Sequence, residues 1–179
     1  MNQLRYFSMA QLETVTRAVE MAEELVSNYY KLSSSQLGRL NYDVRTLSDL
    51  TPSEIVQGHF AQIVKYKLKR KDVMRETEAN DFYKICIQDH SILSTLEKDP
   101  ELEPFAFLLY IVCHELIHVV RFRRFLQQFN VSAEEKLAEE RRVHAKTNEI
   151  LSDLSLDGIE AVLLFYENWR ETAQNQEAP

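Results

Sequence analysis

The segment 104–120, PFAFLLYIVCHELIHVV, restricts the fold more than any other part of the chain. It is apolar on every side of a helical wheel, so a helix made from it has no polar face to turn toward water. We therefore expect a buried central helix around which the other elements pack. Basic residues follow from Arg121 onward and predict that this helix emerges into solvent and ends near Asn130. Ionisable residues interrupt the apolar run, which argues against a membrane span.

The rest of the chain predicts one α+β domain, 1–179, that is predominantly helical. It has only three glycines and four prolines in 179 residues, which favours long helices over many strands joined by tight turns. The predicted parts are a helical N-terminal part at 1–60, a strand pair or hairpin at 61–88, the central helices at 104–151 and a C-terminal helix at 156–172.

Local patterns place the first elements more closely. Residues 8–40 have the periodicity of an amphipathic helix, which the serines at 33–35 end or kink. The sequence Thr51-Pro52-Ser53-Glu54 has the capping signals of a second helix start. Short runs rich in strand formers, at 63–68 and 82–87, predict two strands joined by a basic and polar connection at 69–80. Continued helix is the alternative for both runs.

Composition limits the classes of function. A formal net charge of −7 argues against general binding of nucleic acid or of anionic membranes. The two cysteines, Cys86 and Cys113, lie inside apolar runs, which favours buried reduced thiols over a disulfide. The first residues lack the basic start and apolar stretch of a secretory signal. These features together predict a cytoplasmic protein.

The central segment contains the pattern H-E-x-x-H as His114-Glu115-Leu116-Ile117-His118. Residues four apart lie one turn apart on the same side of a helix, so both imidazoles can reach one metal ion. Glu115, about a quarter turn away, can accept a proton from a metal-activated water. This spacing predicts a zinc site with Glu115 as general base. The alternative is a core helix whose histidines and glutamate satisfy one another by hydrogen bonds.

A third ligand is expected on the next helix. Ser132 and Glu135 form a capping box, which predicts a helix from Ser132 to about Leu151. Glu140 and His144 lie on the apolar stripe of that helix, and two ionisable groups on an inward face need a partner such as a metal. Glu139, by the same helical wheel, points away.

The segment from Ile111 to Val120 resembles the active-site helix of the zincin metallopeptidases, and the downstream Glu140 resembles their gluzincin branch. The resemblance implies His114, His118 and Glu140 as zinc ligands, Glu115 as general base, and a peptide or protein substrate. It also implies an edge strand that holds an extended substrate, for which the run Phe82–Ile87 is the candidate.

The position four residues after the glutamate is usually Asp in gluzincins, and here it is His144. Two assignments stay open: His144 orients the site from behind the ligands, or it binds the metal and Glu140 supports it. We favour Glu140 as the ligand.

Peptide hydrolysis also needs a group that stabilises the oxyanion. Tyr110 and Arg121 lie on the His114 side of the helical wheel, and His90 follows the second predicted strand. The structural alternatives are a core tyrosine, an arginine that pairs with a carboxylate, and a loop histidine in water.

Five arginines near the site offer a positive rim, but we prefer a solvated helix surface that nearby glutamates balance. They are Arg121, Arg123, Arg124, Arg141 and Arg142.

The expected function is that of a zinc-dependent hydrolase, and two other classes remain. Glu115 and His118 also match the Glu-x-x-His spacing of carboxylate-bridged di-iron bundles. A non-catalytic module in which a metal staples the helices is the third class. The metal itself is open to other divalent transition ions, and a homo-oligomer is compatible with the sequence.

Overall fold

A computed structural model describes residues 4–67 and 81–176 of the chain, with side chains described up to residue 168. The elements follow the order α1 (Met9–Tyr30), α2 (Ser34–Gly38), β1 (Tyr42–Arg45), β2 (Ala61–Lys67), β3 (Asp81–Ile87), α3 (Asp89–Lys98), α4 (Pro104–Arg123), α5 (Ala133–Ser152) and α6 (Ile159–Gln176). The fold is α+β and predominantly helical, as the sequence predicted. The predicted connection 69–80 and the side chain of Trp169 lie outside the described residues.

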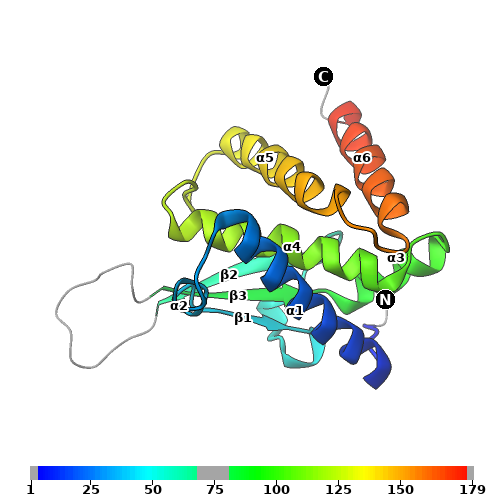
Figure 1. Cartoon of the computed structure of the whole chain (residues 1–179). Coiled ribbons are helices and arrows are strands. Elements are labelled where there is room, and N and C mark those ends of the chain that lie inside the picture. Colours follow the sequence, from blue (N-terminus) through cyan, green and yellow to red (C-terminus); the bar gives the residue numbers. More distant parts are fainter. Residues whose placement is uncertain (1–3, 68–80, 177–179) are drawn as a thin grey trace.

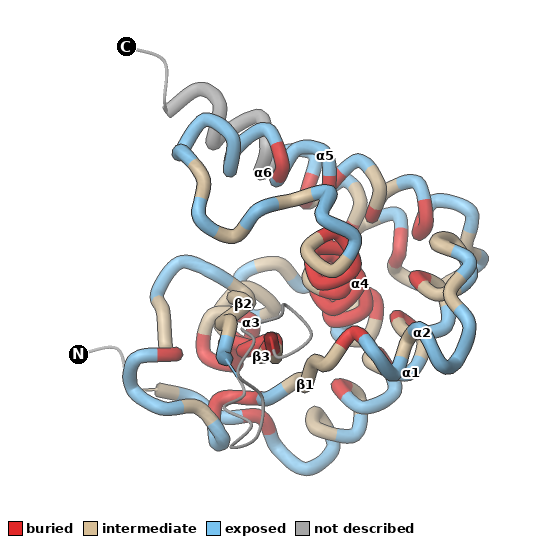
Figure 2. Tube along the Cα trace, turned by 90° about the vertical axis from the view of Figure 1, so that its left-hand side faces the viewer, coloured by how far each residue is buried: buried red, intermediate tan, exposed pale blue. Residues whose placement is uncertain are grey.

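Helix α4 is the centre of the fold. It begins at Pro104, where the Glu103 side chain accepts a hydrogen bond from the Ala106 N–H (2.8 Å). It contacts α1, α5, α6 and β2, so it is covered on several sides (Figure 1). Figure 2 shows it buried along most of its length, which confirms the expected central helix.

Helix α4 is also long and apolar enough to cross a membrane by those two criteria. However, 83% of its most apolar window is buried inside the fold. The buried core helix of a soluble protein meets the same criteria. The helix ends at Arg123 rather than near Asn130, because Phe125 adopts a left-handed conformation (φ 55°) and the chain turns away.

The sheet has three strands in the order β1–β3–β2. β2 and β3 pair antiparallel, with Ile63 opposite Ile85, which confirms the predicted strand pair over the helical alternative. β1 pairs parallel to β3 and was not predicted. It has only four residues, too few for an alternating pattern to be recognised. β3 is therefore the central strand, and β2 lies at an edge.

The capping box predicted at Thr51 is formed, and two predictions for the N-terminal part need correction. Ser8 caps α1, which ends where Lys31 adopts a left-handed conformation (φ 53°). Ser33 then caps the separate short helix α2, so 8–40 is two helices. At 52–54 the predicted helix start forms one 3-10 turn and no more. Ile55 is already extended, because the next residues lead into β2.

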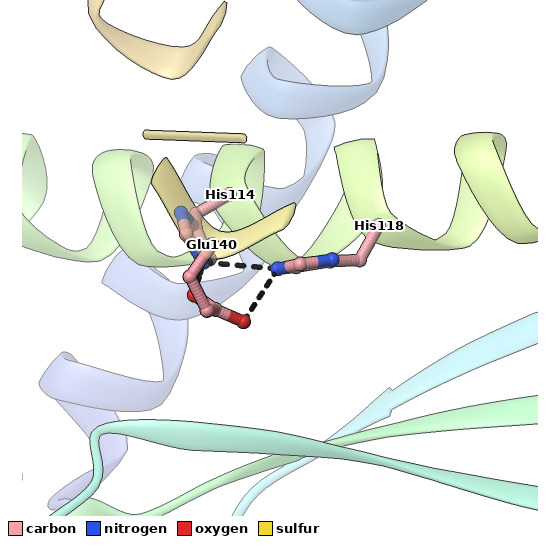
Figure 3. A group of neighbouring side chains, drawn as sticks. All are labelled: His114, His118 and Glu140. Carbon is pink, nitrogen blue, oxygen red and sulfur yellow. Dashed lines mark hydrogen bonds and ion pairs between the residues drawn. The ribbon is translucent and has the colours of Figure 1, made fainter. Parts of the chain in front are cut away.

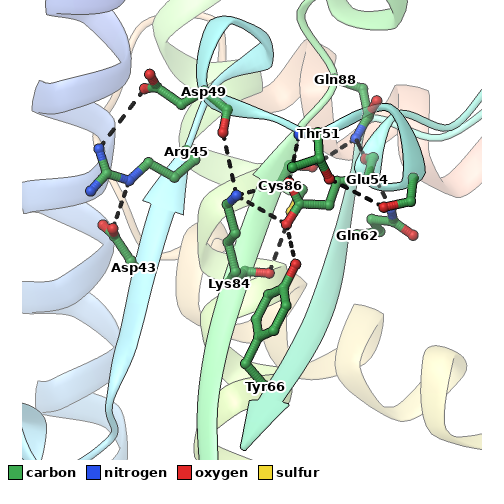
Figure 4. A network of polar contacts seen from close by, with 11 residues as sticks. Asp43, Arg45, Asp49, Thr51, Glu54, Gln62, Tyr66, Lys84, Cys86 and Gln88 are labelled. Atoms are coloured by element: carbon green, nitrogen blue, oxygen red, sulfur yellow. Dashed lines mark hydrogen bonds and ion pairs between the residues drawn. The ribbon is translucent and has the colours of Figure 1, made fainter. Parts of the chain in front are cut away.

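A polar network around Glu54 fixes the segment that enters β2 (Figure 4). The buried Glu54 carboxylate accepts hydrogen bonds from Lys84 Nζ (2.8 and 3.0 Å), from the Thr51 N–H (2.8 Å) and from the Tyr66 hydroxyl. The Gln88 amide donates to the Glu54 carbonyl (2.9 Å) and accepts from the Val56 N–H (3.0 Å). The network holds residues 54–60 against the sheet.

Two further sequence expectations are confirmed, and one helix was not expected. The C-terminal helix is present, with Ile159, Val162 and Tyr166 buried. Cys86 and Cys113 are buried and unbonded to one another, as expected. Helix α3 was not predicted; its first turn is fixed by the Asp89 carboxylate, which accepts from two distant backbone N–H groups.

Candidate metal centre

Two histidines of α4 face the same pocket. His114 and His118 are one turn apart, and their Nε2 atoms lie 3.2 Å from one another. Both residues are buried, at 7% and 4% exposure. The helical spacing in the sequence therefore predicted their common direction correctly.

Glu140, from α5, completes a group of three possible ligands (Figure 3). Its Oε2 lies 3.1 Å from His114 Nε2, and its Oε1 lies 3.1 Å from His118 Nε2. The side chain remains 48% exposed, so the group is open on one side. Helix α5 supplies this ligand because it begins at the Ser132 capping box and packs along α4.

The spacing of the donor atoms fits a tetrahedral metal. Bonds of about 2.0 to 2.1 Å with tetrahedral angles separate neighbouring ligand atoms by about 3.3 Å. The two imidazole Nε2 atoms lie 3.2 Å apart, and each lies 3.1 Å from one Glu140 oxygen, Oε2 for His114 and Oε1 for His118. Two imidazole nitrogens and a carboxylate oxygen suit zinc, and also other divalent transition metals. The open side leaves room for a further ligand.

The charges of the three residues are strongly coupled without a metal. Burial disfavours the imidazolium of His118, but its hydrogen bond to Glu140 outweighs burial and raises its pKa to about 9. Burial would raise the pKa of Glu140, yet its contacts with both histidines hold that pKa far below the usual range. The carboxylate is therefore ionised and paired with imidazole N–H groups. A metal cation would replace the protons of these groups and keep the nitrogens as ligands.

Gln127 orients His118. Its amide oxygen lies 2.9 Å from His118 Nδ1 and can only accept, so Nδ1 carries the hydrogen. With Nδ1 protonated in this way, His118 binds a metal by releasing its Nε2 proton, and the Nε2 lone pair then points at the group of three donors. Gln127 lies in the turn after α4, and no sequence pattern indicated it. His114 Nδ1 is buried without a hydrogen-bond partner among the described side chains.

Glu115 lines the same pocket as the three donors and is partly buried. Burial raises the pKa of its carboxyl, while the adjacent histidines His114 and His118 act in the opposite direction. His59 also lowers this pKa and lines the pocket from the loop before β2. The sequence analysis missed His59, because a lone loop histidine carries no spacing signal.

His144 lies behind Glu140. Its Nε2 is 4.0 Å from Glu140 Oε2, and its ring centroid is 4.2 Å from that of His114. Its Nδ1 is 2.8 Å from the Tyr110 hydroxyl. The group of three donors contains Glu140 and not His144, so the geometry favours Glu140 as the ligand. Tyr110 is buried behind His144 and stacks on Tyr166.

The two remaining oxyanion candidates lie away from the metal group. Arg121 is buried in an ion pair with Glu139, and its guanidinium also donates to the Leu126 carbonyl (3.3 Å). His90 is buried in the first turn of α3, with Nε2 3.1 Å from the Val56 carbonyl. It is therefore not a loop histidine in water, and neither residue lines the pocket.

Glu139 corrects the helical-wheel prediction. It points away from the metal group, as expected, but it is buried rather than solvated. Arg121 on α4 and Arg142 on α5 both pair with its carboxylate. The wheel could not predict this, because the burial comes from α4 packing on that side of α5. The ion pair joins the two helices that carry the metal group.

Of the five arginines, only Arg141 borders the pocket. Arg123 and Arg124 donate to backbone carbonyls, and Arg142 pairs with Glu139. The preferred alternative, a solvated helix surface that nearby glutamates balance, therefore holds for Arg142 but not for Arg121, which is buried. The glutamate that pairs with Arg142 is Glu139, which is buried rather than solvated.

The pocket has a volume of about 550 Å³ and runs between β2, α4 and α5. Gln62 and Ile63 of β2 line it, whereas no residue of β3 does. The implied edge strand is therefore β2 and not Phe82–Ile87, which pairs on both sides as the central strand. Apolar wall residues include Ile111, Phe122 and Phe129.

Comparison of the chain with protein-family models, with curated proteins and with solved structures found no match. The three donors His114, His118 and Glu140, with Glu115 beside them, therefore carry the functional argument from their own geometry.

Proposed function

We propose that the chain is a zinc-dependent hydrolase, a small metallopeptidase with Glu115 as its general base. The observation that carries the proposal is the group His114, His118 and Glu140. Its donor atoms lie within 4.8 Å of one another, close enough to bind one ion, and it opens into a pocket that Glu115 also lines. A zinc ion held there would lower the pKa of a bound water and polarise a substrate carbonyl.

The residues of the chain have distinct parts in this reaction. Glu115 accepts the proton of the attacking water and delivers it to the leaving amine. Burial raises the pKa of its carboxyl, which makes the carboxylate a stronger base. We assign donation to the developing oxyanion to His59, an exposed imidazole that also lines the pocket.

The edge strand β2 supports a peptide as the substrate. Among the described strands it pairs only with β3, so its outer backbone groups are available to an added strand. Its residues Gln62 and Ile63 also line the pocket. An extended peptide paired along β2 would run past the metal group.

The two-iron alternative receives no support from this geometry. It requires Glu115 as a ligand beside His118, and the group of three donors in the described residues does not include Glu115.

The test compares wild type with Glu115→Gln, both loaded with zinc, on a mixture of peptides of diverse sequence. Mass spectrometry of the products measures cleavage, and elemental analysis measures zinc. We expect wild type to cleave peptides, and Glu115→Gln to retain zinc while cleaving at least about a hundredfold more slowly. Equal zinc content with no cleavage by either protein would contradict the proposal and favour a metal-stapled module.

A further inference from the structure

Two basic side chains line the pocket on either side of Glu140. Lys136 precedes Glu140 by one turn of α5, and Arg141 follows it directly. Both are exposed, and neither has a carboxylate partner within residues 4–67 and 81–168. An exposed cation without a partner costs nothing in water, but two of them at the rim of one pocket attract anions.

The other basic residues of α5 differ from this pair. Arg142 is held by Glu139, and Lys146 lies over the ring of Tyr29. The chain as a whole carries a formal charge of −7. With a zinc dication beside Glu115 and Glu140, the pocket would nevertheless be net positive. The charge of the zinc-loaded pocket would thus be opposite in sign to that of the whole chain.

The walls next to these cations are apolar. Ile63, Ile111, Phe122 and Phe129 line the pocket together with Leu137 of α5. Leu137 is 38% exposed, as expected of an apolar residue at the mouth of a pocket. An apolar wall and a basic rim suit a ligand that has an apolar side chain and a nearby anionic group.

We infer that the pocket selects peptides by a carboxylate close to the cleaved bond, which Lys136 and Arg141 bind. This inference rests on the proposed peptidase function. One helical turn is about 5.4 Å, and a residue of extended peptide spans about 3.3 to 3.6 Å. The carboxylate therefore lies within about two residues of the cleaved bond. Its source is the C-terminus of the peptide or an acidic side chain.

Binding to zinc-loaded Glu115→Gln tests the inference without turnover. The probes are four acetylated pentapeptides with a central Phe: one with a free C-terminal carboxylate, one amidated, and two amidated with Glu or Gln after the Phe. Calorimetric titration at low and high salt gives each Kd. We expect a carboxylate to tighten binding by about threefold for each cation it reaches, and salt to weaken this preference.

Variants of Lys136 and Arg141 test whether these two cations cause the preference for a carboxylate. Lys136→Gln with Arg141→Gln, added to Glu115→Gln, should remove the preference and leave binding of the two amidated peptides without Glu unchanged. Lys98→Gln with Arg39→Gln is the matched control, because both residues are exposed and lie outside the pocket. It makes the same change in net charge and should preserve the preference.

The pattern of binding separates the outcomes. A preference for the free C-terminus assigns the carboxylate to the peptide end, and a preference for Glu over Gln assigns it to a side chain. Equal binding of all four peptides would overturn the inference and leave the peptidase proposal standing. Absence of binding by every peptide would overturn both.

Discussion

Two carboxylate clusters of this molecule contrast with one another. The Glu54 carboxylate receives hydrogen bonds from Lys84, Tyr66 and Thr51, so the chain itself supplies the positive charge and the donors that it needs. The Glu140 carboxylate lies 3.1 Å from the Nε2 atoms of His114 and His118, and it stays open to the pocket.

The contrast indicates which cluster is structural and which can bind an ion. At Glu54 the partners are a fixed lysine and backbone groups, and a further ligand would have to displace them. At Glu140 the partners are imidazole nitrogens, which exchange a proton for a metal without moving. The two carboxylates also differ in burial, since the Glu54 side chain is 2% exposed and that of Glu140 is 48% exposed, but the chemistry of the partner atoms decides which can bind an ion.

Removal of each carboxylate should affect a different property, and the largest effect is on the metal. Glu140→Ala removes one of three ligands, so we expect zinc affinity to fall at least about a thousandfold, or about 4 kcal/mol. The fold should persist, because this side chain is half exposed. Competition with a chromogenic chelator measures the affinity. Unchanged zinc affinity would contradict the assignment of Glu140 as a ligand. Binding of the zinc by His144 in place of Glu140 would contradict it as well.

Glu54→Ala should affect stability instead. It leaves Lys84 unpaired at the sheet, and breaking a buried pair of this kind costs about 3 kcal/mol. Urea unfolding of the zinc-free protein, followed by circular dichroism, measures the loss. Zinc stoichiometry should remain that of wild type. A loss of zinc in this variant would show that the two clusters are not independent.

The Glu54 carboxylate should also make the folding stability depend on pH in the acid range. Burial raises the pKa of Glu54, but the hydrogen bonds from Lys84 and Tyr66 outweigh it and lower that pKa from 4.5 to about 2. A lowered pKa stabilises the folded state above pH 4.5, and this contribution is lost as the pH falls toward 2. Stability measured from pH 6 to 2 should therefore fall more steeply in wild type than in Glu54→Gln. Parallel curves would contradict the shift.

The smallest expected effect comes from the residue behind His118. Gln127→Leu removes the acceptor for Nδ1–H, and such substitutions reduce metal affinity by about tenfold. Gln128→Leu is the matched control, since the adjacent glutamine also lines the pocket but is not the residue that accepts from His118 Nδ1. An equal loss of zinc affinity in the two variants would show that Gln127 does not orient His118.

The sequence predicted those parts of the site that depend on local periodicity. His114 and His118 share a direction because four residues make one helical turn, and Glu140 was found from the apolar stripe of its helix. The capping box at Ser132 was equally local, and it is formed.

The missed features depend on tertiary packing. Glu139 is buried because Arg121 of a different helix meets it, and Gln127 reaches His118 only through the turn that follows α4. The edge strand was assigned to the wrong run, because the order of strands in a sheet does not follow from their patterns. β1 placed Phe82–Ile87 at the centre of the sheet and left β2 at the edge beside the pocket.

The most direct test of the central claim is the zinc content of the chain. Wild type and His118→Ala are dialysed together against zinc, washed in metal-free buffer and measured by elemental mass spectrometry. The account predicts one zinc per chain in wild type and none in the variant, with both proteins folded by circular dichroism. Wild type without zinc would contradict it, and would leave His114, His118 and Glu140 as a polar cluster of the core.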